Sequence, residues 1–200
     1  MILAVALTGG LATGKSFVGK VFEELGCLRL EADRLGHETL RPDGEAYSKV
    51  VQLFGPEILD ADGAINRHRL GAIVFPAPER LEQLNAIVHP AVERLRQSRI
   101  AEIAKTDPNA IVVCEAAIYI ETGAWRRFDK VVLTVCGREL QIQRAMARSG
   151  WTRQETEVRL ARQWPDEEKR KVADFVIDTS LSFDDSRRQT TEVYNRLRGL

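Results

Sequence analysis

The chain has 200 residues, and 44% of them are apolar, enough to bury a sizeable core within one elaborated domain. Its 29 basic and 29 acidic side chains leave no net charge, so no overall field draws the protein to nucleic acid or to an acidic membrane surface. This composition favours a small-molecule partner, and nothing in the sequence indicates an obligate protein partner.

A strand, a glycine-rich loop and a helix are predicted in direct succession at the start of the chain. Residues 2–7 are a continuous apolar run, as in a buried parallel strand, and residues 15–25 have a helical pattern that ends before Gly26. The segment between them, Gly9-Gly10-Leu11-Ala12-Thr13-Gly14-Lys15-Ser16, is a complete P-loop motif. Its backbone N–H groups and helix N-terminus bind phosphate, Lys15 adds a full charge, and Ser16 offers a hydroxyl to Mg²⁺. The motif predicts phosphate binding but does not separate a kinase from a nucleotide switch or a motor.

Two carboxylates follow the second predicted strand, residues 27–30. Glu31 and Asp33 lie at the carboxyl end of this strand, where open α/β sheets bind their ligands. A carboxylate near a transferred phosphoryl group can accept the proton of an attacking hydroxyl or help to hold Mg²⁺. Asp33 is equally suited to cap a helix that includes residues 34–40, and the spacing leaves both roles open.

The long interval between the second and third strands predicts an inserted helical subdomain. Helical patterns cover residues 45–54, 67–74 and 78–104, and Pro90 is expected to kink or divide the last of them. His37 and His89 are candidate substrate contacts in this interval, although a lone histidine is more often structural or solvated.

The third strand, residues 110–114, ends directly before Glu115. In P-loop proteins an acid at this position reaches Mg²⁺ directly or through water. On its own the signal is weak, because many strands end in a charged residue.

A charged helical stretch, residues 138–171, separates the fourth strand (130–135) from the fifth (175–177) and is interrupted at Gly150 and Pro165. Arg144 and Arg148 are four residues apart on this stretch and would share one helical face. Such a pair either faces a polyphosphate or lies on a solvated surface. The first alternative makes the stretch a mobile lid.

The alternation of strands and helices predicts an α/β fold: a five-stranded parallel sheet of the P-loop NTPase type flanked by helices, the last of them over residues 184–197. Cys27, Cys114 and Cys136 lack metal-binding spacing and are expected to be small buried hydrophobes. A cytoplasmic location is expected, because the P-loop strand leaves no room for a signal peptide and no apolar run approaches the ~18 residues of a membrane span.

Taken together, these motifs resemble the dephospho-CoA kinase family in order and spacing, over nearly the whole chain. The resemblance is carried by residues 6–10 with Lys15-Ser16, Glu31-Ala32-Asp33, His89-Pro90, 115–123, 128–131, 163–169 and 173–178. The sequence departs from the family pattern at Glu31, Ala117, Tyr119, Ser149 and Thr179.

The resemblance implies ATP-dependent phosphorylation of the ribose 3′-hydroxyl of dephospho-CoA, the last step of coenzyme A synthesis. It implies a nucleotide-binding core (about 1–35, 106–136 and 172–200), a helical CoA-substrate insertion (about 36–105) and a lid over ATP (about 137–171). The expected catalytic residues are Asp33 as base, Lys15, Arg144 and Arg148. The expected nucleotide-binding residues are Gly10, Leu11, Ala12, Thr13, Gly14, Lys15, Ser16 and Phe17. The acceptor is expected to contact Thr8, Asp33, His37, His89 and Glu115. Ser16 would hold Mg²⁺, with Asp33 or Glu115 acting through water.

Two other functions fit parts of the sequence. Another P-loop small-molecule kinase, acting on a nucleoside monophosphate or a sugar, would share the core and the base. A non-enzymatic nucleotide switch would bind guanine nucleotides selectively, but the sequence has no clear Asn-Lys-x-Asp motif.

Overall fold

The computed structural model describes residues 1–200 and divides into two units, Met1–Glu31 with Ile103–Leu200, and Ala32–Glu102. Each unit has its own cluster of buried apolar side chains. The second unit is continuous in sequence and is inserted between the second and third strands of the first.

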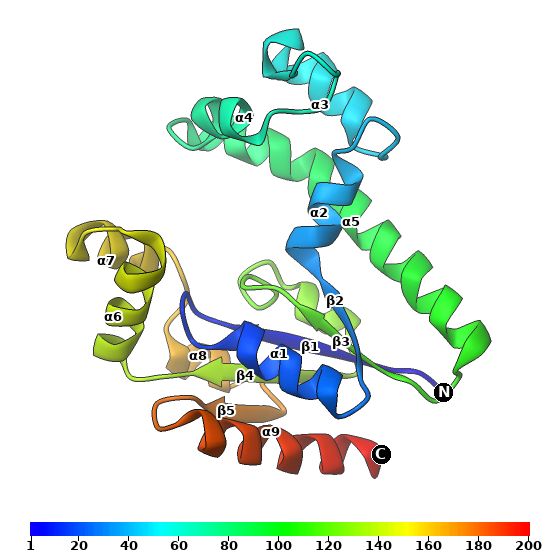
Figure 1. The fold of residues 1–200 in the computed structure, drawn as a ribbon, viewed down its shortest axis with the longest axis vertical. Coiled ribbons are helices and arrows are strands. Elements are labelled where there is room, and N and C mark those ends of the chain that lie inside the picture. Colours follow the sequence, from blue (N-terminus) through cyan, green and yellow to red (C-terminus); the bar gives the residue numbers. More distant parts are fainter. The chain divides into compact units, whose positions relative to one another are not determined.

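The first unit is built on a five-stranded parallel sheet with the order β2-β3-β1-β4-β5 (Figure 1). Its strands are β1 (Leu3–Gly9), β2 (Leu28–Glu31), β3 (Ile111–Glu115), β4 (Lys130–Val135) and β5 (Phe175–Asp178). All five predicted strands are present, and the fold class is confirmed. In the ladder Glu115 pairs with Glu31, so β3 and β2 end level with each other, and it also pairs with Leu7, so β1 continues two residues further, to Gly9.

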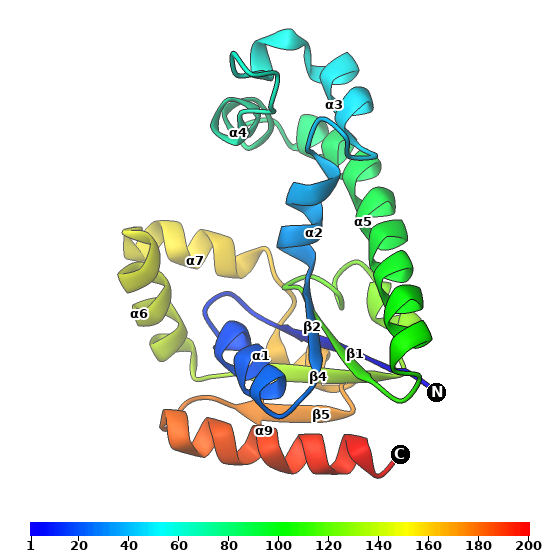
Figure 2. The same ribbon diagram turned by 45° about the vertical axis from the view of Figure 1, so that its right-hand side comes forward.

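One face of the sheet is covered by α1 (Lys15–Glu24) and α9 (Phe183–Arg198), and α9 runs alongside β5 in the view of Figure 2. The strands are apolar on both faces, and because successive side chains of a strand point to opposite faces, every second one points to these helices. The core on this face consists of Val5, Leu7, Val18, Phe22, Cys27, Val113, Val132, Phe175, Ile177, Val193 and Leu197. The opposite face packs Leu133 and Val135 against Ile120.

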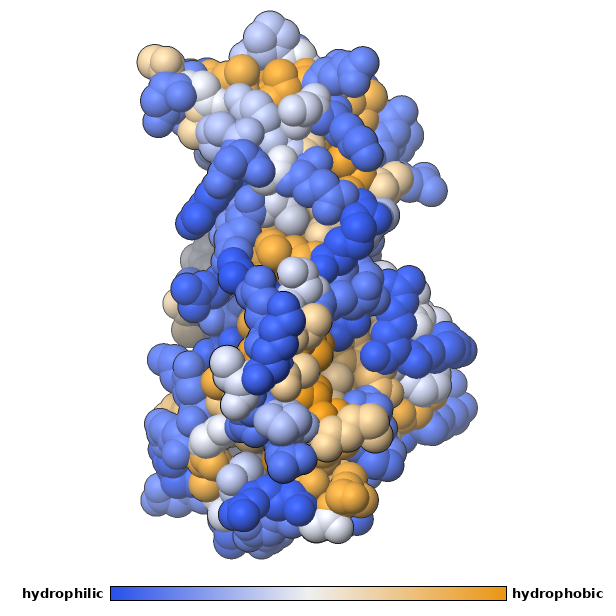
Figure 3. All heavy atoms as spheres, turned by 90° about the vertical axis from the view of Figure 1, so that its right-hand side faces the viewer, coloured by the Kyte–Doolittle hydropathy of each residue, from blue (hydrophilic) through white to orange (hydrophobic).

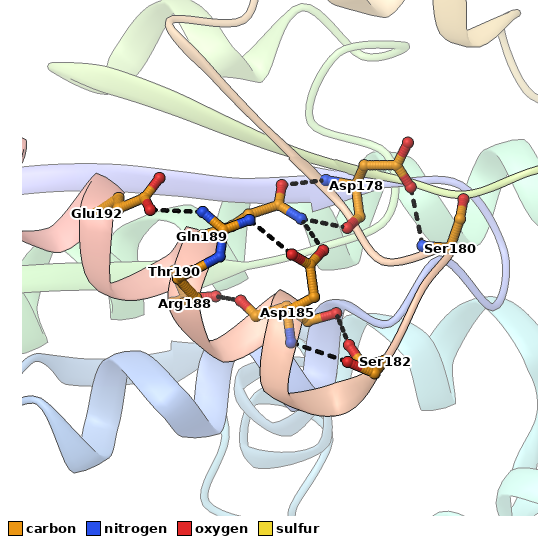
Figure 4. A network of polar contacts seen from close by, with 9 residues as sticks. Asp178, Ser180, Ser182, Asp185, Arg188, Gln189, Thr190 and Glu192 are labelled. Atoms are coloured by element: carbon orange, nitrogen blue, oxygen red, sulfur yellow. Dashed lines mark hydrogen bonds and ion pairs between the residues drawn. The ribbon is translucent and has the colours of Figure 1, made fainter.

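The loop from β5 to α9 is fixed by a network of polar contacts (Figure 4). The Gln189 side chain accepts a hydrogen bond from the Asp178 backbone N–H at 2.9 Å and donates one to the Asp178 carbonyl at 2.8 Å. Ser182 caps α9 by accepting from the Asp185 N–H at 3.1 Å, and Asp178 accepts from the Ser180 N–H at 2.8 Å. The loop therefore holds Thr179, its first residue, in a defined position.

The stretch between β4 and β5 forms α6 (Arg138–Ser149), α7 (Arg153–Ala161) and α8 (Asp166–Arg170). The predicted interruptions are confirmed: Gly150 ends α6 with φ 67°, and Pro165 is the N-cap of α8. A short 3₁₀ turn, η2 (Ala124–Arg127), precedes β4.

The second unit consists of α2 (Ala32–Thr39), α3 (Tyr47–Phe54), the 3₁₀ turn η1 (Pro56–Ile58), α4 (Arg67–Val74) and most of α5 (Pro78–Thr106), whose residues from Ile103 on belong to the first unit. Of the two effects expected of Pro90, a kink or a division, the division is wrong, because α5 continues through it. A proline inside a helix removes one backbone hydrogen bond, and here both flanking turns are anchored by apolar contacts of Ile87, Val88 and Ala91 with the core of the unit.

Hydrophilic residues make up most of the face drawn in Figure 3, with apolar residues between them. None of the helices combines the length and the apolar composition that crossing a bilayer requires. All three cysteines are buried and free, as predicted, and burial raises the pKa of the Cys27 thiol to about 12.

Candidate active site

The P-loop joins β1 to α1 and has the geometry of a phosphate cradle. Gly9 has φ 154°, and a Cβ at this position would lie 2.3 Å from Thr134 Oγ1, so only glycine lets the loop pass so close to β4. Lys15 Nζ donates to the carbonyls of Gly9 at 2.9 Å and Gly10 at 2.8 Å. Because no side chain caps the start of α1, its first turn presents N–H groups and the positive end of the helix dipole to an anion.

Buried threonine hydroxyl groups hold the P-loop against β4 and the end of β5. Thr13 Oγ1 donates to the Gly10 carbonyl at 2.9 Å and lies 2.8 Å from Thr134 Oγ1. Thr179 Oγ1 in turn donates to the Thr13 carbonyl at 3.0 Å. The sequence marked Thr179 only as a departure from the family pattern and did not mark Thr134, because their contacts depend on how the loop packs against β4 and the end of β5.

Arg144 is connected to the P-loop through Thr179. Its guanidinium donates to Thr179 Oγ1 at 3.0 Å and to the Thr179 carbonyl at 2.8 Å. Arg148, on the same helix, is exposed.

Thr8, near the end of β1, is 1% exposed, and its hydroxyl has no hydrogen-bond partner in the protein.

The structure brings together the two residues of the first unit that were predicted to act on Mg²⁺. Ser16 Oγ donates to Glu115 Oε1 at 2.9 Å, so the hydroxyl lone pairs remain available to a cation. Hydroxyl and carboxylate oxygens beside a phosphate cradle are the environment in which Mg²⁺ binds with nucleotides. The residues present therefore fit this ion.

A third residue of this cluster, Arg29, was missed by the sequence analysis. Its Nε and Nη2 atoms donate to Glu115 Oε2 at 3.0 and 2.6 Å, and Nη2 lies 3.2 Å from Glu31 Oε2. The only signal in the sequence is a charged residue within a short, otherwise apolar strand. Its partners could not be identified without the register of β2 and β3.

The stretch of α6 to α8 also contacts the P-loop. Gln163 Oε1 accepts a hydrogen bond from the Leu11 N–H at 2.8 Å. Between these helices and the loop lies a cavity of about 600 Å³, lined by residues that include Gly10, Cys136, Gln141, Gln163, Asp166 and Lys169.

A buried ion pair anchors the end of this stretch. Lys169 is 1% exposed, and its ammonium lies 2.8 Å from Glu121 Oε1, whose side chain is 14% exposed. The backbone N–H of Trp164 also donates to Glu121, at 3.4 Å. Burial raises the pKa of the neighbouring Asp166, against the opposing effect of Lys169 and Arg170.

Replacing Lys169 by methionine should lower the free energy of unfolding by about 3–5 kcal/mol, because the Glu121 charge is left buried without a partner. Lys171→Met is the matched control: this lysine pairs with Glu168 but is 66% exposed, so its loss should change stability by less than about 0.5 kcal/mol. Urea denaturation of both variants measures the difference. Equal losses would show that solvent screens the buried pair as well as the exposed one.

The remaining predicted residues belong to the second unit. Asp33 is exposed and is the second residue of α2, which begins at Ala32, so it lies inside the first turn and is not the N-cap residue. His37 is in contact with the guanidinium of Arg67 at 2.6 Å. Partial burial and Arg67 lower the pKa of His37, while the Asp33 carboxylate acts in the opposite direction. His89 is exposed beside Pro90 on α5.

The second unit also contains a cavity of about 470 Å³ with charged walls. It is lined by residues that include Glu38, Arg41, Asp43, Glu45, Arg94 and Arg99. Arg94 forms an ion pair with Glu45, and Arg99 forms one with Glu38 at 3.3 Å.

Comparison with known proteins identifies the family. The family model for dephospho-CoA kinase matches residues 3–185. The chain belongs to the dephospho-CoA kinase family. A relative named dephospho-CoA kinase from Geobacter sulfurreducens is 40% identical over 190 residues, covering 95% of this chain and 96% of the relative. The resemblance noted in the sequence is thereby confirmed.

Solved structures agree with this assignment. A dephospho-CoA kinase from Campylobacter jejuni matches with a TM-score of 0.74 and 28% identity, over 100% of this chain and 98% of the other. The crystal structure of TT1252 from Thermus thermophilus matches with a TM-score of 0.81 and 32% identity, over 98% and 97% of the two chains.

Proposed function

We propose that this protein transfers the γ-phosphoryl group of ATP to the ribose 3′-hydroxyl of dephospho-CoA, giving CoA and ADP in the final step of coenzyme A biosynthesis. The observation that carries the proposal is a complete phosphate cradle with the Ser16–Glu115 pair beside it, in a chain that matches the dephospho-CoA kinase family model over residues 3–185.

The reaction forms one bond and breaks another at the γ-phosphorus. The acceptor oxygen bonds to phosphorus, the bond to the β–γ bridging oxygen breaks, and ADP leaves. The acceptor proton passes to the carboxylate of Asp33, which follows the carboxyl end of β2 with only Ala32 between them. A carboxylate is a weak base in neutral solution, so Asp33 contributes chiefly by orienting the hydroxyl.

The residues of the cradle compensate the charge of the moving phosphoryl group. Lys15 exchanges its two backbone carbonyl partners for phosphate oxygens, and the N–H groups at the start of α1 bind the phosphate chain. Ser16 would hold the Mg²⁺ that accompanies ATP, with Glu115 acting through water, and the ion would supply positive charge to the phosphates.

Residues 137–171 serve as a lid over ATP in this proposal. Two contacts support it: Gln163 binds the Leu11 N–H, and Arg144 is linked through Thr179 to the Thr13 carbonyl. Arg144 and Arg148 supply positive charge to the polyphosphate from α6. The second unit binds the CoA part of the acceptor with the help of His37 and His89, and its cavity offers arginines, now paired with acids, that can bind a phosphate group.

The cytoplasm is the proposed location, since three buried free cysteines suit a reducing compartment.

An acceptor panel tests the proposed reaction. Purified protein with Mg²⁺ and ATP should consume ATP in stoichiometric amounts when dephospho-CoA is added, while adenosine, AMP and gluconate should be poor acceptors. A coupled ADP-release assay measures the rates, and mass spectrometry identifies the product. Equal or faster turnover of another acceptor would point instead to a different P-loop small-molecule kinase, and guanine-selective binding without turnover would point to a switch.

A further inference from the structure

A buried arginine lies beside the Ser16–Glu115 pair. Arg29 belongs to β2, at the edge of the sheet, yet its side chain is only 8% exposed. In the parallel ladder Arg29 pairs with Val113, which packs in the core beneath α1. Side chains in register point to the same face, so Arg29 runs between the sheet and α1.

Arg29 also lies between two carboxylates. Glu31 and Glu115 are register partners at the ends of adjacent strands, an arrangement in which like charges repel. Nη2 of Arg29 is 2.6 Å from Glu115 Oε2 and 3.2 Å from Glu31 Oε2. The positive charge of Arg29 therefore offsets the repulsion between Glu31 and Glu115, so both carboxylates can lie at the carboxyl ends of β2 and β3.

The two oxygens of Glu115 have separate partners. Oε2 accepts both N–H groups of Arg29, and Oε1 accepts the Ser16 hydroxyl. Because two N–H groups of the guanidinium bind one oxygen, Oε2 is held in place and Oε1 is left to the Ser16 hydroxyl. Arg29 thus helps to determine which oxygen of Glu115 the Ser16 hydroxyl binds.

Gly19 provides the space for this pair. It lies in α1, one turn after Ser16, and a Cβ there would be 2.6 Å from Arg29 Nε and 2.9 Å from Glu115 Oε2. Glycine is unfavourable in a helix interior. Its presence in α1 is explained by the Arg29 side chain, which passes directly against the helix at this position.

We propose that Arg29 is a positioning residue of the nucleotide site, with Gly19 as the residue that makes room for it. Arg29 holds Glu115 so that Ser16 donates to Oε1 and keeps its lone pairs available to the cation of a metal–nucleotide complex. This inference rests on the proposed function, since it assigns the residues that orient the metal–nucleotide site of that reaction.

A double-mutant cycle with Ser16 tests the role. Arg29→Met should weaken the binding of ADP in the presence of Mg²⁺ by about tenfold, the usual effect of losing a partner that orients a metal site. In a Ser16→Ala background the same change should weaken binding by less than about twofold, because Arg29 acts through Ser16. Titration calorimetry measures both. Equal weakening in the two backgrounds would indicate a general effect of charge or stability and overturn the proposal.

Two further variants complete the cycle. Arg188→Met is the matched control, since Arg188 also pairs with two carboxylates, Asp185 and Glu192, but is 61% exposed; it should leave ADP binding unchanged. Arg29→Lys keeps the charge and loses the two-point contact. It should restore only part of the affinity, and full restoration would overturn the claim that guanidinium geometry orients Glu115.

Gly19→Ala gives an independent test, because its effect on the Tm should have opposite signs in the presence and absence of Arg29. In the wild-type background the added methyl displaces the pair, so the Tm and the affinity for ADP with Mg²⁺ should both fall. In the Arg29→Met background the methyl has space and alanine is the better helix former, so the Tm should rise. A rise in both backgrounds would show that the pair does not need glycine.

Neither readout uses dephospho-CoA. A wild-type protein that binds ADP with Mg²⁺ but does not phosphorylate dephospho-CoA would therefore refute the proposed function and leave the role of Arg29 to be decided by the cycle.

Discussion

Replacing Lys15 by alanine should lower kcat for dephospho-CoA phosphorylation by about 10² to 10³-fold, the usual cost of removing one group that stabilises developing charge. Lys15 is the only charged residue of the P-loop motif, residues 9–16. Its ammonium donates to the backbone carbonyls of Gly9 and Gly10. A flexible ammonium can follow the γ-phosphoryl group as it moves, which backbone N–H groups cannot do.

The fold should survive the Lys15 substitution, because Lys15 is the first residue of α1 and its side chain is only partly buried. Steady-state kinetics and a thermal unfolding curve of the same preparation separate activity from stability. Lys20→Ala is the matched control, an exposed lysine on the same helix. A Lys15→Ala protein with wild-type turnover would contradict the assignment of the P-loop as the phosphate site.

Asp33→Asn should lower kcat by about 10² to 10⁴-fold, the range of general acid–base catalysis, and should leave the affinity for ATP nearly unchanged. The substitution keeps the size of the side chain and removes the charged acceptor for the hydroxyl proton. Glu31→Ala should cost less activity, because Glu31 is not the proposed base.

Asp184→Asn separates catalysis by Asp33 from its effect on the helix. Both aspartates are exposed and lie in the first turn of a helix, α2 or α9, so each should contribute about 0.3–1 kcal/mol through the helix dipole. Calorimetry should find similar small losses of stability in the two variants, and only Asp33→Asn should lose activity per folded molecule. If both kept full activity, Asp33 would have a structural role alone.

Apolar runs and one dense motif made most of the fold predictable. The buried strands of a parallel sheet are continuous apolar segments, so all five could be recognised, and the P-loop fixed the first strand, loop and helix together. Ser16 and Glu115 were each predicted to act on Mg²⁺, and in the structure a hydrogen bond joins them. The roles of Asp33, Arg144 and Arg148 remain predictions.

Other features depend on contacts that leave no periodic trace in a sequence. The Arg29–Glu115 pair requires the register of β2 and β3 and the missing side chain of Gly19. The Thr13–Thr134 contact depends on how closely the loop approaches β4. Local rules also failed at two helices: α5 continues through Pro90, because core packing outweighs one lost hydrogen bond, and α2 begins before Asp33.

The order of the strands in the sheet constrains how the chain can fold during its synthesis. β1 lies at the centre of the sheet, but both of its neighbours, β3 and β4, come more than 100 residues later in the sequence. The inserted unit, Ala32–Glu102, is continuous and has its own apolar core, so it can assemble while β1 still lacks both neighbours. The P-loop makes hydrogen bonds to Thr134 and Thr179, so its final form requires the chain as far as Thr179 to have left the ribosome. Nucleotide binding thus becomes possible only after the sheet has closed around its first strand.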